Sequence, residues 1–354
     1  MILDLENYIG NLTATWKKQT LYFKKPSGTS RGVLLDKDYY IVSVFKSEVL
    51  LSTSEVSYIK GLSVDDENGI EIKLDEVCAD VSAWSTLIKN GLFDFPAIKF
   101  ALEMSLLEIQ GGERFQYFDN TFLSQGKGIP INGLIWMGTE EAMKSQIEVK
   151  LSEGFKCVKL KIGAIDFNQE LALLEGIRSK YNKHQIELRV DANGAFSPKD
   201  AMDKLSQLSK FDLHSIEQPI KQGQIEEMRD LCKNTPLDIA LDEELIGVNG
   251  FENKKALLES IKPQYIILKP SLLGGFIATK EWIDIAEAMD IKWWITSALE
   301  SNIGLNAIAQ FTSYLNTDMY QGLGTGGLYE NNIASPLEIR DANLFYNPSK
   351  QWGI

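Results

Sequence analysis

The sequence predicts an α/β protein in which a (β/α)₈-type (TIM-like) barrel follows an α+β domain. From residue 131 onward, short apolar segments alternate with helical segments, and there are eight such strand candidates. Their ends recur every 24 to 30 residues, the length of one strand, one helix and two loops. An open doubly wound sheet is the alternative, but no G-x-G-x-x-G follows the first strand. The residues near the eight strand ends are Met137, Lys161, Asp191, Glu217, Asp242, Lys269, Ser297 and Leu323.

The first 125 residues have a different pattern. Residues 12–23 and 39–45 are rich in β-branched and aromatic types and predict strands, joined by the turn-rich segment 26–32. Apolar side chains at helical spacing between Pro96 and Gly112 then predict a helix. We therefore expect an α+β domain over 1–125, the barrel over 126–328, and a C-terminal segment, 329–354, that folds back on the first domain.

Composition excludes several classes of function. Lys plus Arg is 36 and Asp plus Glu is 49, so the net charge of −13 disfavours a nucleic-acid partner. Two histidines leave little for a Ser-His-Asp or His-rich metal site. Three distant cysteines suit a reducing compartment, and neither a signal peptide nor a membrane-length apolar run is present. We expect a soluble cytoplasmic protein without a membrane partner, and a homo-oligomer is compatible with the sequence.

Charged residues stand at the carboxyl ends of successive predicted strands, although parallel barrel strands are usually apolar on both faces. Because side chains alternate, Lys159 and Lys161 both point into the barrel and the residue between them faces the helices. The same alternation turns Arg189, Asp191, Asp242 and Lys269 inward. Any one of them could belong to a structural ion pair, but buried charge on six consecutive strands indicates a site.

These residue types favour one kind of chemistry. Asp191, Glu217 and Asp242 come from neighbouring strands, and oxygen ligands without His or Cys suit Mg²⁺, for which Mn²⁺ is an acceptable substitute. Lys161 and Lys269 lie on strands two and six, which stand opposite each other in a barrel. A nearby cation and burial lower a lysine pKa from about 10.4 toward a useful base. We therefore expect proton abstraction α to a carboxylate of a small anionic substrate.

Five motifs give the sequence a resemblance to the enolase superfamily, in its muconate-lactonizing-type branch. They are, in order, K-x-K at 159–161, D-A-N-G at 191–194, I-E-Q-P at 216–219, L-D-E at 241–243 and L-K-P at 268–270. The resemblance covers essentially the whole chain. It implies that the carboxylate trio binds Mg²⁺, that Lys161 and Lys269 act on opposite faces of the substrate, and that the first domain caps the barrel through loops 27–32 and 60–63.

Within that branch the sequence is most similar to the o-succinylbenzoate synthase family. Segments 132–138, 297–301 and 321–326 carry this weaker resemblance, together with Arg189. It implies a hydro-lyase of menaquinone biosynthesis, which converts 2-succinyl-6-hydroxy-2,4-cyclohexadiene-1-carboxylate to o-succinylbenzoate by syn dehydration through an enediolate. Lys161 would remove the α-proton and protonate the departing hydroxide, Lys269 would stabilise the enediolate, and Lys159 would hydrogen-bond the metal-bound carboxylate.

The substrate contacts are predicted from weaker sequence features than the metal ligands and lysines. Ser297, Arg189, Gly324 and Ser30 are the candidates, although Ser297 is equally a turn former, and Arg189, one layer below Asp191, is better explained as a charge-balancing group than as a catalyst. An N-acylamino acid racemase or dipeptide epimerase is the alternative within the superfamily. The Asp-x-Asp usual on strand eight of the epimerases is absent, and the Gly-rich turn in its place suits an anionic carboxylate. A non-catalytic binding barrel is the alternative of another class.

Overall fold

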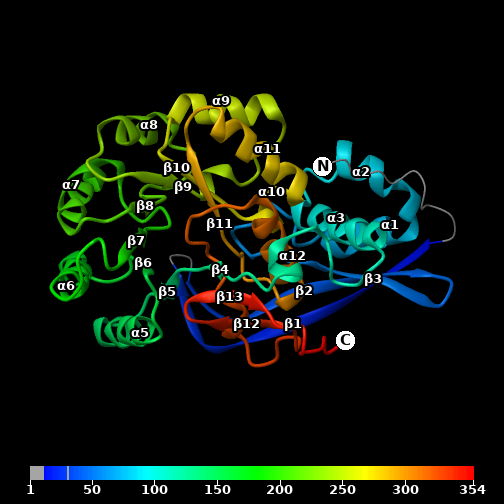
Figure 1. The fold of residues 1–354 in the computed structure, drawn as a ribbon. Coiled ribbons are helices and arrows are strands. Elements are labelled where there is room, and N and C mark those ends of the chain that lie inside the picture. Colours follow the sequence, from blue (N-terminus) through cyan, green and yellow to red (C-terminus); the bar gives the residue numbers. More distant parts are fainter. Residues whose placement is uncertain (1–11, 30–31) are drawn as a thin grey trace.

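The computed structural model describes residues 12–29 and 32–354. Its first part opens with an antiparallel sheet of β1 (Leu12–Thr29), β2 (Gly32–Lys46) and β3 (Val49–Val56), in that order (Figure 1). The two predicted strands are present and longer than expected. Strand β3 was missed because its buried positions include Ser52, Ser54 and Glu55, which hide the apolar alternation of a strand.

Helices cover one face of this sheet. They are α1 (Ile70–Ala79), η1 (Val81–Ala83), α2 (Trp84–Asn90) and α3 (Pro96–Gly111), followed by the short α4 (Thr121–Ser124). The predicted helix is α3, which packs against β3. Pro96 begins it, where a missing N–H costs nothing, and Gly112 ends it with a φ of 73° that favours glycine.

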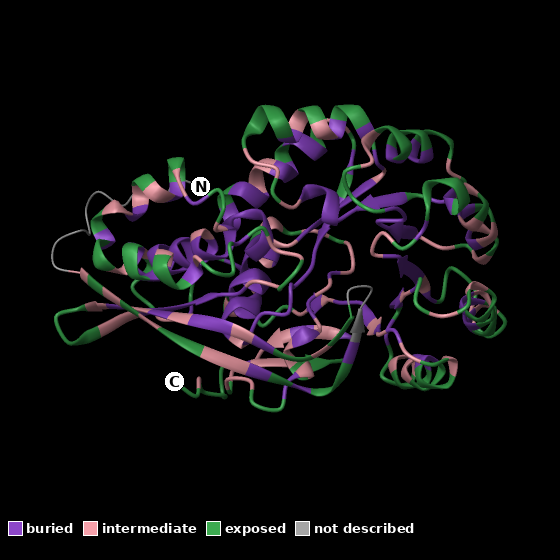
Figure 2. Ribbon diagram, turned by 180° about the vertical axis from the view of Figure 1, so that it is seen from behind, coloured by how far each residue is buried: buried purple, intermediate pink, exposed green. Residues whose placement is uncertain are grey.

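The second part is a curled parallel sheet of seven strands in chain order, with helices on its outer side (Figure 1). Buried residues concentrate on the strands, whereas the outer helices alternate buried and exposed positions (Figure 2). Its elements are β5 (Gly133–Ile135), α5 (Glu140–Ser152), β6 (Cys157–Lys161), α6 (Phe167–Arg178), β7 (Glu187–Asp191), α7 (Pro198–Leu208), η2 (Ser209–Phe211), β8 (Ser215–Glu217), α8 (Ile225–Asn234), β9 (Ile239–Leu241), η3 (Glu243–Leu245), α9 (Phe251–Ile261), β10 (Tyr265–Leu268), α10 (Pro270–Leu273), α11 (Gly275–Glu287), β11 (Lys292–Ile295), α12 (Asn302–Leu315) and η4 (Thr325–Leu328).

The eighth predicted strand is reduced to two bridging residues. Gln321 exchanges backbone hydrogen bonds with Pro130 and Asn132, at 2.9 and 3.0 Å, beside β5. Gly322 donates to Ile295 at 2.8 Å, at the end of β11. A Cβ on Gly322 would lie 2.0 Å from Thr296 Oγ1, so only glycine allows this approach. The prediction of a full strand is corrected, but the two residues connect both edges of the seven-stranded sheet.

The C-terminal segment contacts both parts of the chain. Strands β12 (Leu337–Arg340) and β13 (Asn343–Tyr346) form a small sheet with β4 (Ile129–Pro130), which precedes the barrel. Phe23 of β1 bridges to Tyr329, and the ring of Trp352 stacks on Phe115 at 4.1 Å. No helix in the two described ranges is long and apolar enough to cross a membrane.

Alternation along the barrel strands divides their side chains between two environments. Ile266 and Leu268 of β10 belong to the main core beneath the helices. Tyr265 and Ile267 of the same strand instead join a separate cluster inside the barrel, which also contains Trp294. The expectation that inward positions are charged is therefore correct only near the carboxyl ends of the strands, because the closed end is filled by large apolar rings.

Glu103 of α3 lies where the first part of the chain meets the barrel. Its Oε2 accepts hydrogen bonds from the N–H groups of Phe276 (2.5 Å) and Ile277 (3.2 Å), in the first turn of α11. The side chain is fully buried, and its Oε1 has no hydrogen-bond partner. Burial raises the pKa of Glu103 to about 7, although Lys99 and the two N–H groups oppose this change.

We expect wild-type stability to fall relative to Glu103→Gln as the pH rises from about 5 to 8. A carboxyl whose pKa is higher in the folded chain binds its proton more tightly there, so stability is lost between its ordinary 4.5 and about 7. That difference corresponds to roughly 3 kcal/mol. Urea unfolding of both proteins across this pH range measures it, and a pH-independent difference would contradict it.

Candidate active site

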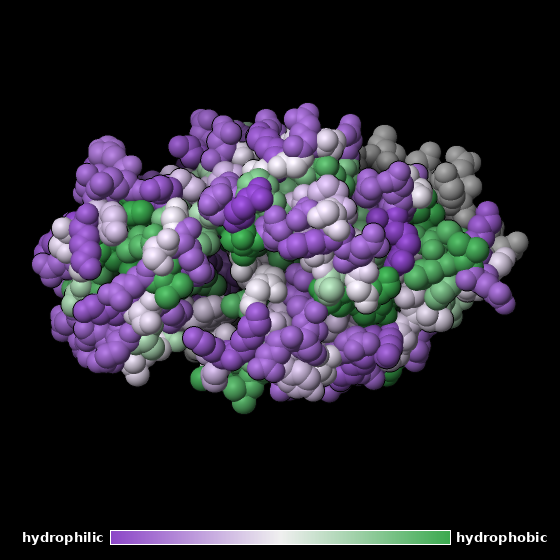
Figure 3. Space-filling view, turned by 60° about the horizontal axis from the view of Figure 1, so that its bottom comes forward, coloured by the Kyte–Doolittle hydropathy of each residue, from purple (hydrophilic) through white to green (hydrophobic). Residues whose placement is uncertain are grey.

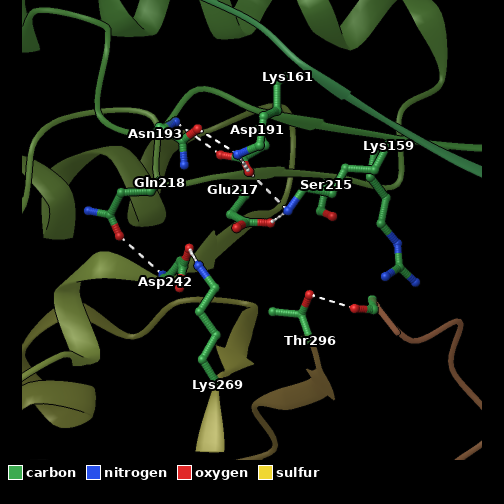
Figure 4. A network of polar contacts seen from close by, with 12 residues as sticks. Lys159, Lys161, Asp191, Asn193, Ser215, Glu217, Gln218, Asp242, Lys269 and Thr296 are labelled. Atoms are coloured by element: carbon green, nitrogen blue, oxygen red, sulfur yellow. Dashed lines mark hydrogen bonds and ion pairs between the residues drawn. The ribbon is translucent and has the colours of Figure 1, made fainter. Parts of the chain in front are cut away.

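Strand register brings the predicted acids and lysines together at the carboxyl ends of the barrel strands. Lys161 of β6 pairs with Asp191 of β7, which pairs with Glu217 of β8. Asp242 and Lys269 directly follow β9 and β10. Because all these strands are parallel, their ends open on one side of the sheet, and the side chains converge there (Figure 4).

Every acid of this group is in contact with an ammonium group. Lys159 Nζ lies 2.9 Å from Asp191 Oδ2 and also pairs with Glu217 Oε2. Lys161 Nζ lies 3.1 Å from the same Asp191 oxygen, and Lys269 pairs with Asp242 (Figure 4). Asp191, Glu217 and Asp242 are each at most 2% exposed, so these charges are stable only because they are paired.

The carboxyl groups differ in how tightly they hold a proton. Burial opposes ionisation of Asp191, but the charges of Lys159, Lys161 and Lys269 outweigh it and lower the Asp191 pKa. Burial and the neighbouring Asp191 charge raise the pKa of Glu217 well above its usual value, and Lys159 offsets this only in part. Two carboxylates on adjacent strands therefore repel each other.

Lys159 and Lys269 both have raised pKa values while they are paired with the acids, and the lowering expected for a base lysine beside a bound metal stays a prediction. Burial acts to lower the pKa of both side chains. For Lys159, the charges of Asp191 and Glu217 outweigh burial and raise the pKa. For Lys269, the charges of Asp242, Glu243 and Glu217 do the same. An ammonium paired with carboxylates is held in its charged form.

The donor set fits a hard divalent cation. Asp191, Glu217 and Asp242 supply carboxylate oxygens from three successive strand ends, the ligand type that Mg²⁺ prefers. Glu217 Oε1 is buried without a hydrogen-bond partner, which is costly for a carboxylate and leaves the atom available to a cation. Across 12–29 and 32–354, no three acidic, His or Cys side chains are arranged so that they could hold a metal ion as they stand, and Lys159 and Lys269 are paired with Glu217 and Asp242.

Two polar residues that sequence reasoning did not single out hold these groups in place. Asn193 Oδ1 accepts a 2.8 Å hydrogen bond from Lys161, and the Asn193 amide nitrogen donates to Glu243 at 3.0 Å. Gln218 Oε1 accepts from the backbone N–H of Asp242 at 3.1 Å, which fixes the turn after β9. Asn193 and Gln218 have positive φ angles of 43° and 38°, which are uncommon for residues other than glycine. Their positions inside the D-A-N-G and I-E-Q-P motifs were the available signal.

A cavity of about 890 Å³ lies over the strand ends. The barrel contributes Lys159, Lys161, Asp191 and Lys269 to its wall, and the first part of the chain contributes residues of the two loops expected to close the barrel mouth. From those loops, Ser27, Gly32, Lys60 and Leu62 line the cavity. The face of the molecule drawn in Figure 3 is mostly hydrophilic, with separate hydrophobic patches and a hollow left of centre.

The four expected substrate contacts have different positions. Ser297 and Gly324 line the cavity, and the Ser297 hydroxyl also bonds Glu300 (2.5 Å) and Thr325 (2.6 Å). Arg189 lies below the cavity wall, where it is 2% exposed and bonds Glu187 and the Tyr320 carbonyl. Its guanidinium lies 4.2 Å from the ring centroid of Trp294, so it serves the barrel interior. Ser30 lies outside the described residues.

The two histidines lie away from the cavity wall. His184 is exposed in the turn before β7. His214 precedes β8, and its Nδ1 lies 2.9 Å from Ser215 Oγ. Burial lowers the pKa of His214 to about 4, so it is uncharged near neutral pH. The chemistry of the site therefore depends on lysines and carboxylates.

Fold and site together define a lysine- and carboxylate-based barrel enzyme of the enolase type. The model of the family described as "Enolase C-terminal domain-like" matches residues 142–353, more than half of the chain. The chain therefore belongs to the enolase superfamily.

Relatives with named activities and one solved structure are similar to this chain over most of its length. The o-succinylbenzoate synthase of Desulfotalea psychrophila is 48% identical over 362 residues, which cover 94% of this chain and 98% of that protein. The crystal structure of MenC from the same bacterium has a TM-score of 0.83 at 44% identity, covering 95% and 100% of the two chains. A hydrophobic dipeptide epimerase of Roseobacter litoralis is 25% identical, covering 90% and 95%.

We expect Mg²⁺ to raise the thermal unfolding midpoint of the wild-type protein and not that of Asp242→Asn. A ligand that binds only the folded chain stabilises it by about 2.7 kcal/mol at a concentration 100 times its Kd. Asp284→Asn, which changes a half-exposed acid paired with Lys280 on α11, serves as the control and should respond like the wild type. Mn²⁺ should give the same ranking. Equal stabilisation of all three proteins would contradict the assignment of the site.

Proposed function

We propose that this chain catalyses the Mg²⁺-dependent dehydration of 2-succinyl-6-hydroxy-2,4-cyclohexadiene-1-carboxylate to o-succinylbenzoate. The observation that carries the proposal is the pair Lys161 and Lys269, which lie on β6 and directly after β10 and line one cavity on either side of three carboxylates. The 48% identity to a synthase over nearly the full length of both chains supports the choice of substrate. The proposed ion would be held by Asp191, Glu217 and Asp242.

In this proposal Lys161 moves the proton. Its side chain is 12% exposed and lines the cavity, and its Nζ is held by Asp191 and Asn193 at 3.1 and 2.8 Å. A substrate carboxylate placed above Asp191 would bring its α-carbon toward this nitrogen. The same nitrogen then returns the proton to the departing hydroxide on the same face, so that removal of H and OH is syn and the balance is loss of one water.

Lys269 faces the substrate from the opposite side. Its ammonium keeps its charge, because Asp242 and the neighbouring acids raise its pKa. A fixed positive charge suits stabilisation of the enediolate that forms when the α-proton leaves. Lys159 lies deeper, 8% exposed, and can hydrogen-bond the carboxylate of the substrate while it remains paired with Asp191. The bound Mg²⁺ would supply further positive charge to the same carboxylate.

The walls of the cavity suit an anionic substrate. Among the described lining residues, Asp191 is the one acid, whereas seven are lysines. The lysines are Lys24, Lys25, Lys60, Lys150, Lys159, Lys161 and Lys269. Two of them, Lys24 and Lys25, come from β1, far from the strand ends in sequence but on the same cavity. A substrate with carboxylates at both its ring and its succinyl tail matches this distribution.

The decisive test is turnover of the cyclohexadiene carboxylate by purified protein with Mg²⁺. We expect wild-type activity that chelation abolishes. Lys161→Met and Lys269→Met should each lower kcat by about 10²- to 10⁴-fold, because each removes a group that acts in the transition state while keeping the side-chain volume. Lys156→Met, at an exposed lysine just before β6, is the control and should stay near wild type.

Three results would overturn the proposal in different ways. No turnover by a folded, metal-binding wild-type protein would reject the synthase activity. Exchange of the α-proton of N-acylamino acids or dipeptides with solvent deuterium, without dehydration, would assign the chain to the racemases or epimerases instead. Lys161→Met or Lys269→Met at wild-type rates would reject the roles of these lysines and favour a binding barrel.

A further inference from the structure

The loop after β11, residues 297–301, forms part of the cavity wall and is held in an uncommon conformation. Ser297, Ala298 and Leu299 all line the cavity. Leu299 has a φ of 65°, in the left-handed region that residues other than glycine and asparagine rarely adopt. A backbone in this region persists only when the surrounding structure determines it.

Two side chains from outside the barrel hold the Leu299 carbonyl. Lys37 Nζ, from β2, donates to Leu299 O at 2.8 Å and lies 3.5 Å from Ala298 O. Tyr329 Oη, from the C-terminal segment, donates to the same Leu299 oxygen at 2.7 Å. The first part of the chain and its last segment therefore converge on one peptide group of the cavity wall, some 260 residues from Lys37 in sequence.

Hydrogen-bond acceptors and acidic side chains surround the buried ammonium group of Lys37. The side chain is 8% exposed and also donates to Ser57 Oγ. Burial lowers the Lys37 pKa, and the charges of Glu55 and Glu300 oppose that change. Those two acids are fully buried. The ammonium is thus the positive charge that compensates two carboxylates, as well as a donor to the loop.

The same two acids hold the rest of the loop. Glu300 accepts from the Ala298 N–H at 2.8 Å and from the Ser297 hydroxyl. Glu55, from β3, accepts from the N–H groups of Ser301 (2.8 Å) and Gly304 (2.9 Å) at the start of α12. Lys37, Glu55 and Glu300 therefore fix both the carbonyl side and the N–H side of the loop.

We propose that Lys37 is a positioning residue, which sets the shape of the 297–299 wall against which the substrate binds. The inference rests on the proposed function, since that function defines the substrate. In this view the first domain is more than a cover over the barrel. It determines, through one buried ammonium, where Ser297 and Leu299 meet the part of the substrate that does not react.

The test compares Lys37→Met with Lys254→Met. Lys254, on α9, is another buried lysine, 2% exposed and bonded to the Ala278 carbonyl and Glu281, and it does not line the cavity. Both substitutions should destabilise the fold. We expect Lys37→Met to raise KM about tenfold with kcat within about threefold of wild type, because uniform binding is lost, whereas Lys254→Met leaves both constants unchanged per folded molecule.

Tyr329→Phe removes the second donor to the same carbonyl and keeps the ring. It should shift KM in the same direction by a smaller factor, which keeps the inference testable if Lys37→Met fails to fold. Amide hydrogen exchange gives a readout independent of turnover. We expect residues 298–304 to exchange at least about tenfold faster in Lys37→Met than in wild type, with no change there in Lys254→Met.

The possible outcomes separate this inference from the proposed function. An inactive wild type in which Lys37→Met still loosens 298–304 would reject the synthase activity and support the positioning role of Lys37. An active wild type with KM, kcat and exchange at 298–304 unchanged in Lys37→Met and Tyr329→Phe would reject that role. Loss of kcat alone, without a KM change, would also reject it, since it would place Lys37 in the chemical step.

Discussion

The charge balance at the strand ends is the constraint on which the site depends. Three lysines and three acids lie almost wholly out of water, and each acid touches at least one ammonium. Removing Lys159 would leave Glu217 without an ammonium partner, and removing Lys269 would leave Asp242 without one, which costs several kcal/mol. The register of β6, β7 and β8 is equally constrained, because a slip of one residue would turn Lys161 and Asp191 toward the helices.

The walls of the site depend on the first domain in a similar way. Glu103 caps the first turn of α11, which follows the strand that bears Lys269. Glu55 caps α12, which follows the loop of Ser297. In both cases a carboxylate from outside the barrel satisfies free N–H groups at a helix start, where negative charge is favoured. The barrel and the first domain are therefore joined by buried polar contacts at the starts of these two helices.

Sequence reasoning was accurate where a feature repeats and inaccurate where it depends on distant contacts. Seven strands of the barrel and the inward positions of its charged residues follow from length periodicity and two-residue alternation. The prediction of a full eighth strand was wrong because the chain at Gly322 passes very close to Thr296. This contact joins two separate segments, so no local sequence pattern reveals it. The role of Glu55 was equally invisible, since its partner Ser301 lies 246 residues away. The sequence left two interpretations of Ser297, a turn former and a substrate contact, because one hydroxyl can both bond Glu300 and face a cavity.

A chain with a net charge of −13 binds an anion only if its charges are segregated. The cavity achieves this, because seven of the lining residues that the structure describes are lysines and one is an acid. At physiological salt the surface acids are screened beyond about 8 Å, so a substrate in the cavity responds mainly to these lysines. Pairing with Asp191, Glu217 and Asp242 keeps the deepest lysines charged, and a divalent cation on those acids would leave the lysines free to face substrate. The acids that make the empty barrel stable are therefore the same groups that prepare it for an anionic ligand.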